Sequence, residues 1–420
     1  MSRLLRRFAA ISAAFVTAVT ISGCGAVTIY SQYRELSNLE LVRVVGIDAA
    51  EEVAEVTVAM SSDPEAPPEM MTRRAADLPA ALEQLADNPT RRQPYYSHTE
   101  HILIGESAAQ KSVAPYLDYV TRSAEMRAST SLFIVRGEAG TLIKETTDDK
   151  SSTESMLTYL VDHAADMGAG SVYTCGETSA ALAGRGCALV MAVRRSESDT
   201  AQAEAPARVE PAGYAVLIDG RLAGYLEPDA ARGALLLTNK FRSCITEVRD
   251  KEERKAVIEL TGAKCDLTPQ FDTSGVLAGI KVDLTLEGNI TSLDPGCRPD
   301  NDSWRRAVEG RLDDLSESWL RAALRRSIEL EADCTDLESS LRMTAPLRMD
   351  RALRKSGENE SQTDFAALLP DLDIRFCTKT TLRRSFDLDT PLDVNGIQSD
   401  PQSSGIDQIM PESGETADAE

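Results

Sequence analysis

The feature that most constrains the fold of this chain is a predicted export leader at the N-terminus. Cleavage of the leader removes the first residues from the mature protein, and export determines the compartment in which the rest folds. The leader starts with the basic residues Arg3, Arg6 and Arg7. An uncharged, largely apolar stretch follows over residues 8–20. The leader ends in Ile21-Ser22-Gly23, directly before Cys24. Small residues directly before a cysteine are what a lipoprotein signal peptidase requires. The apolar stretch is shorter than the roughly 20 residues of a membrane-spanning helix. We predict a lipoprotein signal peptide over residues 1–23 and lipidation of Cys24. The alternative is an ordinary signal peptide with a chance cysteine.

Charge does not help this chain to attach to a membrane. The formal net charge is -22, and loss of the three leader arginines lowers it to -25. Anionic lipid repels such a body, and nucleic-acid binding needs surplus Lys and Arg instead. Fatty acyl chains such as palmitate on Cys24 must therefore hold the protein. Each buried methylene contributes about 0.8 kcal/mol, and two chains give stable anchoring where one does not.

Seven further cysteines leave the redox state open, because an odd number cannot pair completely within one chain. None stands in a CxxC pair, which argues against a zinc ribbon or a thioredoxin motif. Buried free thiols and a partial disulfide framework are both compatible with the sequence. The seven are Cys175, Cys187, Cys244, Cys265, Cys297, Cys334 and Cys377.

Strand-like and helix-like segments alternate between residues 39 and 388, which predicts an α+β fold. We expect three mixed α/β domains with largely antiparallel sheets, the last domain carrying one long helix. The predicted divisions are a signal peptide 1–23, a lipid-anchored tether 24–38, an N-terminal α/β domain 39–196, a linker or loop 197–211, a small β-rich middle domain with a hairpin 212–266, a C-terminal α/β domain 267–388 and an acidic disordered tail 389–420.

The middle and C-terminal segments carry the clearest local signals. Asp219-Gly220 lies between two apolar runs and suits the positive φ angles of a two-residue hairpin turn. The apolar residues 234–237 and 256–260 indicate further strands. Apolar residues recur at helical spacing from Trp304 to Ile328, with Asp302 or Ser303 as the expected N-cap.

Chemistry-bearing motifs are scarce. The most suggestive is His98-Thr99-Glu100-His101, which reads His-x-Glu-His. A zincin helix needs His-Glu-x-x-His. The inverted form needs His-x-x-Glu-His, which is one residue longer than the stretch present here. If this segment is a strand, His101 points away from the face of His98 and Glu100. A structural role is therefore favoured over a metal site. We predict no catalytic residue, no metal, no cofactor and no enzymatic activity.

Several stretches, taken in order, resemble the Ger(x)C family. The resemblance starts with the lipobox at Cys24 and continues through an opening strand that ends in Gly-Ile-Asp, an aromatic-Ser-His segment before an Ile-rich strand, an Arg followed by the next strand, and a hairpin followed by Arg-Gly and a Leu-rich run. These stretches are residues 35–48, residues 95–106, Arg122 with residues 130–135 and Gly137, and residues 213–239.

The resemblance implies a lipoprotein subunit, the C-type, of a nutrient germinant receptor in an endospore-forming bacterium. Such a subunit is expected on the outer face of the spore inner membrane, beside integral-membrane A-type and B-type subunits. It would serve as a non-catalytic scaffold in nutrient-triggered spore germination. Two rival functions are an extracytoplasmic solute-binding lipoprotein, which captures a ligand between lobes, and an envelope hydrolase that uses His98 and Glu100.

Overall fold

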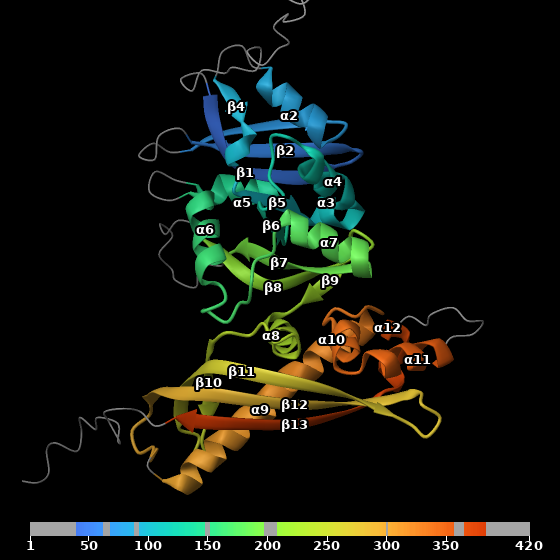
Figure 1. Ribbon diagram of the computed structural model, residues 1–420. Helices are drawn as coiled ribbons and strands as arrows, with labels where there is room; N and C mark the ends of the chain where they lie inside the picture. The colour runs from blue at the N-terminus through green and yellow to red at the C-terminus, as the bar shows by residue number, and fades with distance from the viewer. Residues whose placement is uncertain are drawn as a thin grey trace, which may run out of the picture.

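Two β-sheets, stacked along one direction, organise the computed structural model (Figure 1). The structure describes residues 39–61, 68–87, 92–147, 152–196, 208–299, 301–356 and 365–383. The predicted signal peptide, the tether with Cys24 and the acidic tail lie outside the described residues, as does most of the predicted linker.

The first sheet is mixed, with parallel strands at its centre and antiparallel strands on both sides. β1, β5, β6 and β7 pair in parallel, β2 and β3 extend the sheet beyond β1, and β8 and β9 extend it beyond β7. The short strand β4 also pairs with β1. The strands are β1 (Leu39–Ala50), β2 (Val53–Met60), β3 (Glu69–Ala75), β4 (Gln93–Tyr95), β5 (His101–Gly105), β6 (Ser131–Val135), β7 (Cys187–Arg195), β8 (Val209–Ile218) and β9 (Arg221–Leu226).

Helices cover both faces of the first sheet. Its central strands are therefore buried on both sides, and most of their residues are apolar. One face packs against α2 (Leu78–Ala86), α3 (Glu106–Lys111), α4 (Ala114–Arg122) and α7 (Cys175–Arg185) in a closed apolar cluster. The other face packs against α5 (Ala139–Thr146) and α6 (Thr153–His163). This second cluster continues into the other half of the molecule and makes one core of the two sheets.

The predicted hairpin is confirmed. β8 pairs antiparallel with β9, and Ile218 faces Arg221 across a turn of two residues. Asp219 and Gly220 both have positive φ, 48° and 75°. This is the mirror-image turn that matches the twist of a hairpin and that favours Asp-Gly.

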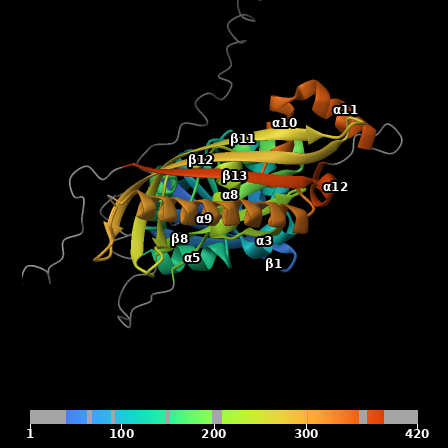
Figure 2. The same cartoon turned by 90° about the horizontal axis from the view of Figure 1, so that it is seen from below.

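The second sheet is also mixed and has a helix along it. Its order is β10-β11-β12-β13, antiparallel except for the parallel pair β12 and β13. The long helix α9 (Asp302–Glu329) packs against β10 and β13, and Figure 2 shows it running beside the strands. The elements are β10 (Cys244–Arg249), β11 (Lys255–Phe271), β12 (Leu277–Leu293), α10 (Leu337–Thr344), α11 (Pro346–Ser356), α12 (Phe365–Leu368) and β13 (Asp373–Arg383).

The strand predicted over residues 234–237 is wrong, because these residues form the end of helix α8 (Pro228–Leu237). Pro228 starts the helix, where its missing N–H costs nothing. The four residues are all buried between the two sheets. A short apolar run that is buried on every side has no periodicity, so the pattern does not separate a strand from a helix.

The long helix is confirmed, but its predicted N-cap is one or two residues late. Asn301 caps α9: its Oδ1 accepts from the backbone N–H of Ser303 at 2.8 Å and of Trp304 at 3.3 Å. Both residues proposed from the sequence, Asp302 and Ser303, already belong to the first helical turn. Cap position depends on backbone angles that side-chain pattern does not determine.

Strands of the predicted middle segment, residues 212–266, join both sheets. β8 and β9 bond into the first sheet, while β10 and β11 belong to the second. The division of the chain into three domains stays a prediction; hydrogen bonding establishes the two sheets and the shared core between them.

Asp48 in β1 holds the N-terminus of α5. Its two carboxylate oxygens accept from the backbone N–H groups of Ala139 and Gly140, each at 2.8 Å. Burial raises the pKa of Asp48, while the two backbone hydrogen bonds lower it. A side chain on Gly105 would place its Cβ 1.8 Å from Oδ1 of Asp48, so the neighbouring strand needs glycine there. The Gly-Ile-Asp stretch thus ends in a residue that ties a helix to the sheet.

We expect Asp48→Ala to lower the free energy of unfolding by about 2–3 kcal/mol, because two buried N–H donors lose a charged acceptor. Urea denaturation measures the change. The matched control is Asp77→Ala, which removes the exposed cap of α2 that accepts from Ala80 N–H at 2.9 Å. That cap is worth about 1 kcal/mol. Equal losses in the two variants would contradict the role given to Asp48.

Candidate functional site

The structure separates the two histidines of the predicted cluster. His98 ends a short 3-10 turn (Tyr96–His98) and is exposed, with its ring 5.7 Å from that of Tyr95. His101 starts β5 and is buried, where its Nε2 lies 2.9 Å from Oγ1 of Thr158 on α6. The segment is thus a turn followed by a strand. No group of three metal-ligating side chains occurs among the described residues.

Glu100 takes part in an ion pair with Arg43. Its carboxylate lies 2.6 Å from Nη1 of Arg43, whose Nε lies 3.9 Å from Glu154. Burial raises the pKa of Glu154, an effect that Arg43 opposes and Glu100 reinforces. Glu100 and His98 therefore engage different neighbours, and their contacts give no support to the hydrolase that would use them as a dyad.

His101 makes stability depend on pH. Burial lowers its pKa to about 4 from 6.5. Between these values the unfolded chain binds a proton that the folded chain does not, so the free energy of unfolding falls as pH drops from 6.5 towards 4. The loss should reach roughly 2–3 kcal/mol. We expect His101→Gln to remove this part of the pH dependence in urea denaturation, whereas His98→Gln, an exposed control, should keep it. Parallel pH profiles for wild type and His101→Gln would refute this assignment.

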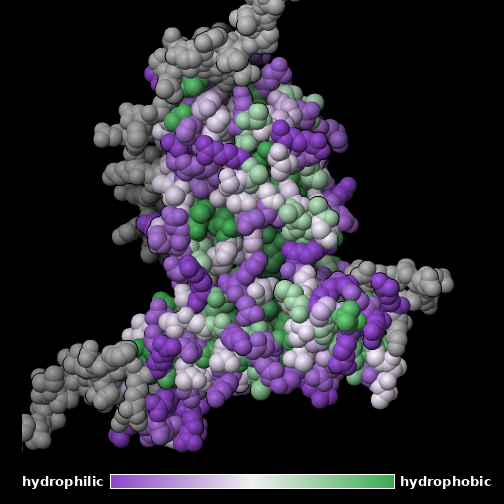
Figure 3. Space-filling model, viewed as in Figure 1, coloured by the Kyte–Doolittle hydropathy of each residue, from purple (hydrophilic) through white to green (hydrophobic). Residues whose placement is uncertain are grey.

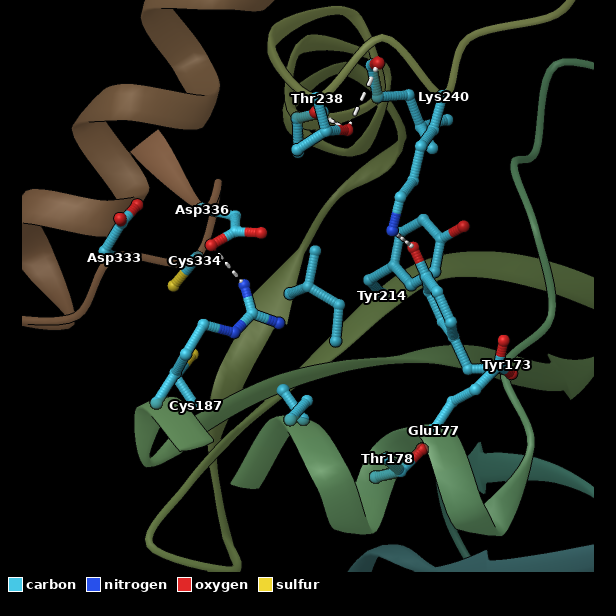
Figure 4. Close-up of a pocket in the computed structure, with 16 residues that line it drawn as sticks. Tyr173, Glu177, Thr178, Cys187, Tyr214, Thr238, Lys240, Asp333, Cys334 and Asp336 are labelled. Atoms are coloured by element: carbon cyan, nitrogen blue, oxygen red, sulfur yellow. Dashed lines mark hydrogen bonds and ion pairs between the residues drawn. The ribbon is translucent and has the colours of Figure 1, made fainter. Parts of the chain in front are cut away.

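A cleft lined by charged side chains lies between the two sheets. Its volume is about 200 Å³, and a neighbouring cavity of about 480 Å³ shares part of its lining. One wall comes from helix α7 and from strand β7 of the first sheet. The other wall comes from α8 and the connection between α9 and α10 (Figure 4). We call this the intersheet cleft; the lining residues used below are Tyr173, Arg185, Cys187, Lys240, Asp333, Cys334 and Asp336.

An ion pair closes one side of the intersheet cleft. Arg185, the last residue of α7, places Nη1 2.8 Å from Oδ1 of Asp336. Asp336 stands just before α10 with a positive φ of 54°. The pair is partly exposed, so its contribution to stability is small, but it fixes which residues of the two walls face each other.

Asp333 holds the start of α10, next to the wall of the cleft that the α9–α10 connection forms. Its carboxylate accepts from the backbone N–H groups of Leu337 at 3.0 Å and Glu338 at 2.8 Å, at the start of α10. Burial raises the pKa of Asp333, and these two hydrogen bonds lower it. The carboxylate is thereby committed to the helix terminus, where it satisfies N–H groups that would lack partners.

At the far end of the cleft, Lys240 donates from Nζ to the hydroxyl of Tyr173 at 3.1 Å and lies 4.9 Å from the centre of that ring. Tyr214 donates to the carbonyl of Ser171 at 2.8 Å. The polar groups of the cleft are thus held by neighbours from two walls. The arrangement offers charge of both signs for a small polar ligand.

Two buried cysteines face the intersheet cleft. Cys187 starts β7 on one wall and Cys334 lies in the α9–α10 connection on the other. A hydrogen bond from the Cys187 thiol lowers the pKa of Cys334, while burial opposes this effect. The same contact, together with burial, raises the pKa of Cys187. The two cysteines are nearly 150 positions apart in the chain, so their spacing in the sequence does not reveal the pair.

Two domains described for spore germination proteins account for most of the chain. Residues 32–195 match the domain described as "Spore germination protein N-terminal domain", and residues 212–385 match "Spore germination B3/ GerAC like, C-terminal". The chain belongs to the GerAC-like family of spore germination proteins. The resemblance to the Ger(x)C family is confirmed. The GerAC-like family consists of germinant receptor subunits and is not a known enzyme family.

A solved structure supports the fold of this GerAC-like protein. The "Crystal Structure of the GerBC protein" superposes with a TM-score of 0.52 at 15% identity, covering 81% of this chain and 97% of that chain. At this identity the likeness concerns the fold, and it confirms the predicted α+β class. No curated protein matches the sequence. Within the described residues, no helix is long and apolar enough to cross a bilayer.

Proposed function

We propose that the chain is the C-type subunit of a nutrient germinant receptor, anchored by acyl chains on Cys24, and that it acts as a non-catalytic assembly subunit. The match of both halves to spore germination domains carries this proposal. The leader that ends at Cys24 supports the anchor. The location that follows is the outer face of the spore inner membrane.

The order of the fold supports a defined orientation. The described fold begins at Leu39, so residues 24–38 separate the anchor from β1. A fully extended tether of this length reaches at most about 50 Å. In Figure 1, β1 and α2 lie at one end of the molecule and the second sheet at the other. The first sheet would then stay near the bilayer, and the second sheet would extend from it.

The face of the molecule seen in Figure 3 supports assembly on the membrane. Hydrophilic side chains cover most of the face seen in Figure 3, and hydrophobic ones form small separate patches. An acyl anchor confines the chain to the plane of its partners, which raises their effective concentration. Modest polar interfaces with the integral-membrane A-type and B-type subunits would then suffice.

Purification of a tagged chain from spore membranes tests this role. We expect the A-type and B-type subunits to co-purify, and deletion of the gene to abolish germination in response to a subset of nutrients. Reintroducing the unaltered chain should restore that response. Normal germination across a full nutrient panel, together with purification of the chain by itself, would refute the proposal.

The intersheet cleft favours one alternative, an extracytoplasmic solute-binding lipoprotein. Arg185 and Lys240 from different walls line a cavity of about 200 Å³. Calorimetry on the soluble Cys24→Ala protein with single nutrients separates the two functions. Saturable binding whose affinity falls at least tenfold in Arg185→Ala would favour solute capture. Loss of a hydrogen bond to a charged group lowers affinity by roughly this factor. No heat with any nutrient would favour the assembly role.

A further inference from the structure

We propose that Cys187 and Cys334 form a reversible disulfide that joins the two walls of the intersheet cleft. The proposal goes beyond the receptor assignment and does not depend on it. The bond would convert the contact between the first sheet and the α9–α10 connection into a covalent clamp.

The two cysteines meet from opposite walls. Both line the cavity of about 200 Å³, and their exposed fractions are 7% for Cys187 and 4% for Cys334. Figure 4 shows them on the same side of the cavity, from the first sheet and from the α9–α10 connection. They are the two cysteines, among the described residues, that line this cavity, and both are free thiols in the structure.

A neighbouring ion pair joins the two chain segments that carry the cysteines. Arg185 pairs with Asp336 at 2.8 Å. Arg185 lies two residues before Cys187 in the chain, and Asp336 lies two residues after Cys334. The ion pair therefore holds the segment that carries Cys187 beside the segment that carries Cys334.

The chemistry assigns a different part to each sulfur. The interaction with the Cys187 thiol lowers the pKa of Cys334. The thiolate is the nucleophile in disulfide exchange, so Cys334 is the attacking sulfur. Cys334 lines the intersheet cleft of about 200 Å³, where a small reagent would reach it.

The exchange balances with a small-molecule disulfide as oxidant. The Cys334 thiolate attacks one sulfur of the reagent and forms a mixed disulfide, and the displaced thiolate takes the proton that Cys334 released. The Cys187 sulfur then attacks the Cys334 sulfur, and its proton passes to the second departing thiolate. The protein loses two hydrogens, the reagent becomes two thiols, and an excess of thiol reverses both steps. The exported location that the leader indicates permits such a bond.

The test uses the full-length mature protein in detergent, incubated with oxidised or with reduced glutathione. We expect oxidation to lower the intact mass by two hydrogens, to remove two titratable thiols and to link the peptides of Cys187 and Cys334 in a non-reducing digest. Because the bond closes a long loop, Tm should rise by roughly 5–10 °C and return to its original value with dithiothreitol.

Single-cysteine variants complete the test. Cys187→Ser and Cys334→Ser should each abolish the cross-link and the Tm shift, whereas Cys265→Ser, a buried control, should keep both. If either test variant fails to fold, the peptide map of the wild type still decides. Separate alkylation of both thiols after oxidation, a glutathione adduct that persists on one of them, or a cross-link to another cysteine would overturn the proposal.

Discussion

Replacing Cys24 with alanine is expected to move the protein from the membrane pellet to the soluble fraction. The variant loses the thiol that would carry the acyl chains. The charge expected after removal of the leader is -25, which opposes binding to anionic lipid. Each lost chain should lower the membrane partition constant by roughly 10⁴-fold, so release should be nearly complete.

Fractionation of membranes and quantitative immunoblotting measure this release. The matched control is Cys377→Ala, which removes an exposed cysteine from β13 and should leave the protein in the pellet. Mass spectrometry of the wild type should find a lipidated N-terminal cysteine at position 24. A wild-type protein with an intact, unlipidated leader, or a Cys24→Ala protein that stays in the pellet, would contradict the anchor and remove the main support for the location.

Gly233→Ala is expected to cause the largest loss of folding stability among the substitutions considered. A Cβ at this position in α8 would lie 1.9 Å from the backbone oxygen of Trp319 and 2.5 Å from its carbonyl carbon, both in α9. Neither atom belongs to a flexible side chain, so the two helices must separate. We expect the free energy of unfolding to fall by roughly 3 kcal/mol or more, despite the better helix propensity of alanine.

Guanidinium denaturation and the fluorescence of the two tryptophans measure this effect. Separation of α8 from α9 should expose Trp319, which is 2% exposed and stacks near the guanidinium of Arg232, and should shift its emission to the red. The matched control is Gly310→Ala in α9, where a Cβ meets no atom within 4 Å. That variant should be unchanged or up to about 1 kcal/mol more stable. Similar stabilities for the two variants would show that the helices adjust easily.

Local patterns in the sequence were sufficient for several elements. The Asp219-Gly220 turn follows from the conformational preferences of its two residues, which do not depend on distant contacts. The periodicity from Trp304 to Ile328 predicts α9 because one stripe of a long helix must face the core. The spacing of His98, Glu100 and His101 argues against a shared metal site, but it does not reveal the turn at His98.

The sequence by itself therefore indicated the α+β class, the hairpin and the long helix, because each depends on residues close together in the chain; the export leader with Cys24 stays a prediction. Tertiary structure decided the rest. It made residues 234–237 a helix, since burial on every side hides periodicity, and it distributed the strands of residues 212–266 between two sheets. It also brought Cys187 to Cys334 and Arg185 to Asp336, contacts between distant segments that depend on how the two sheets pack.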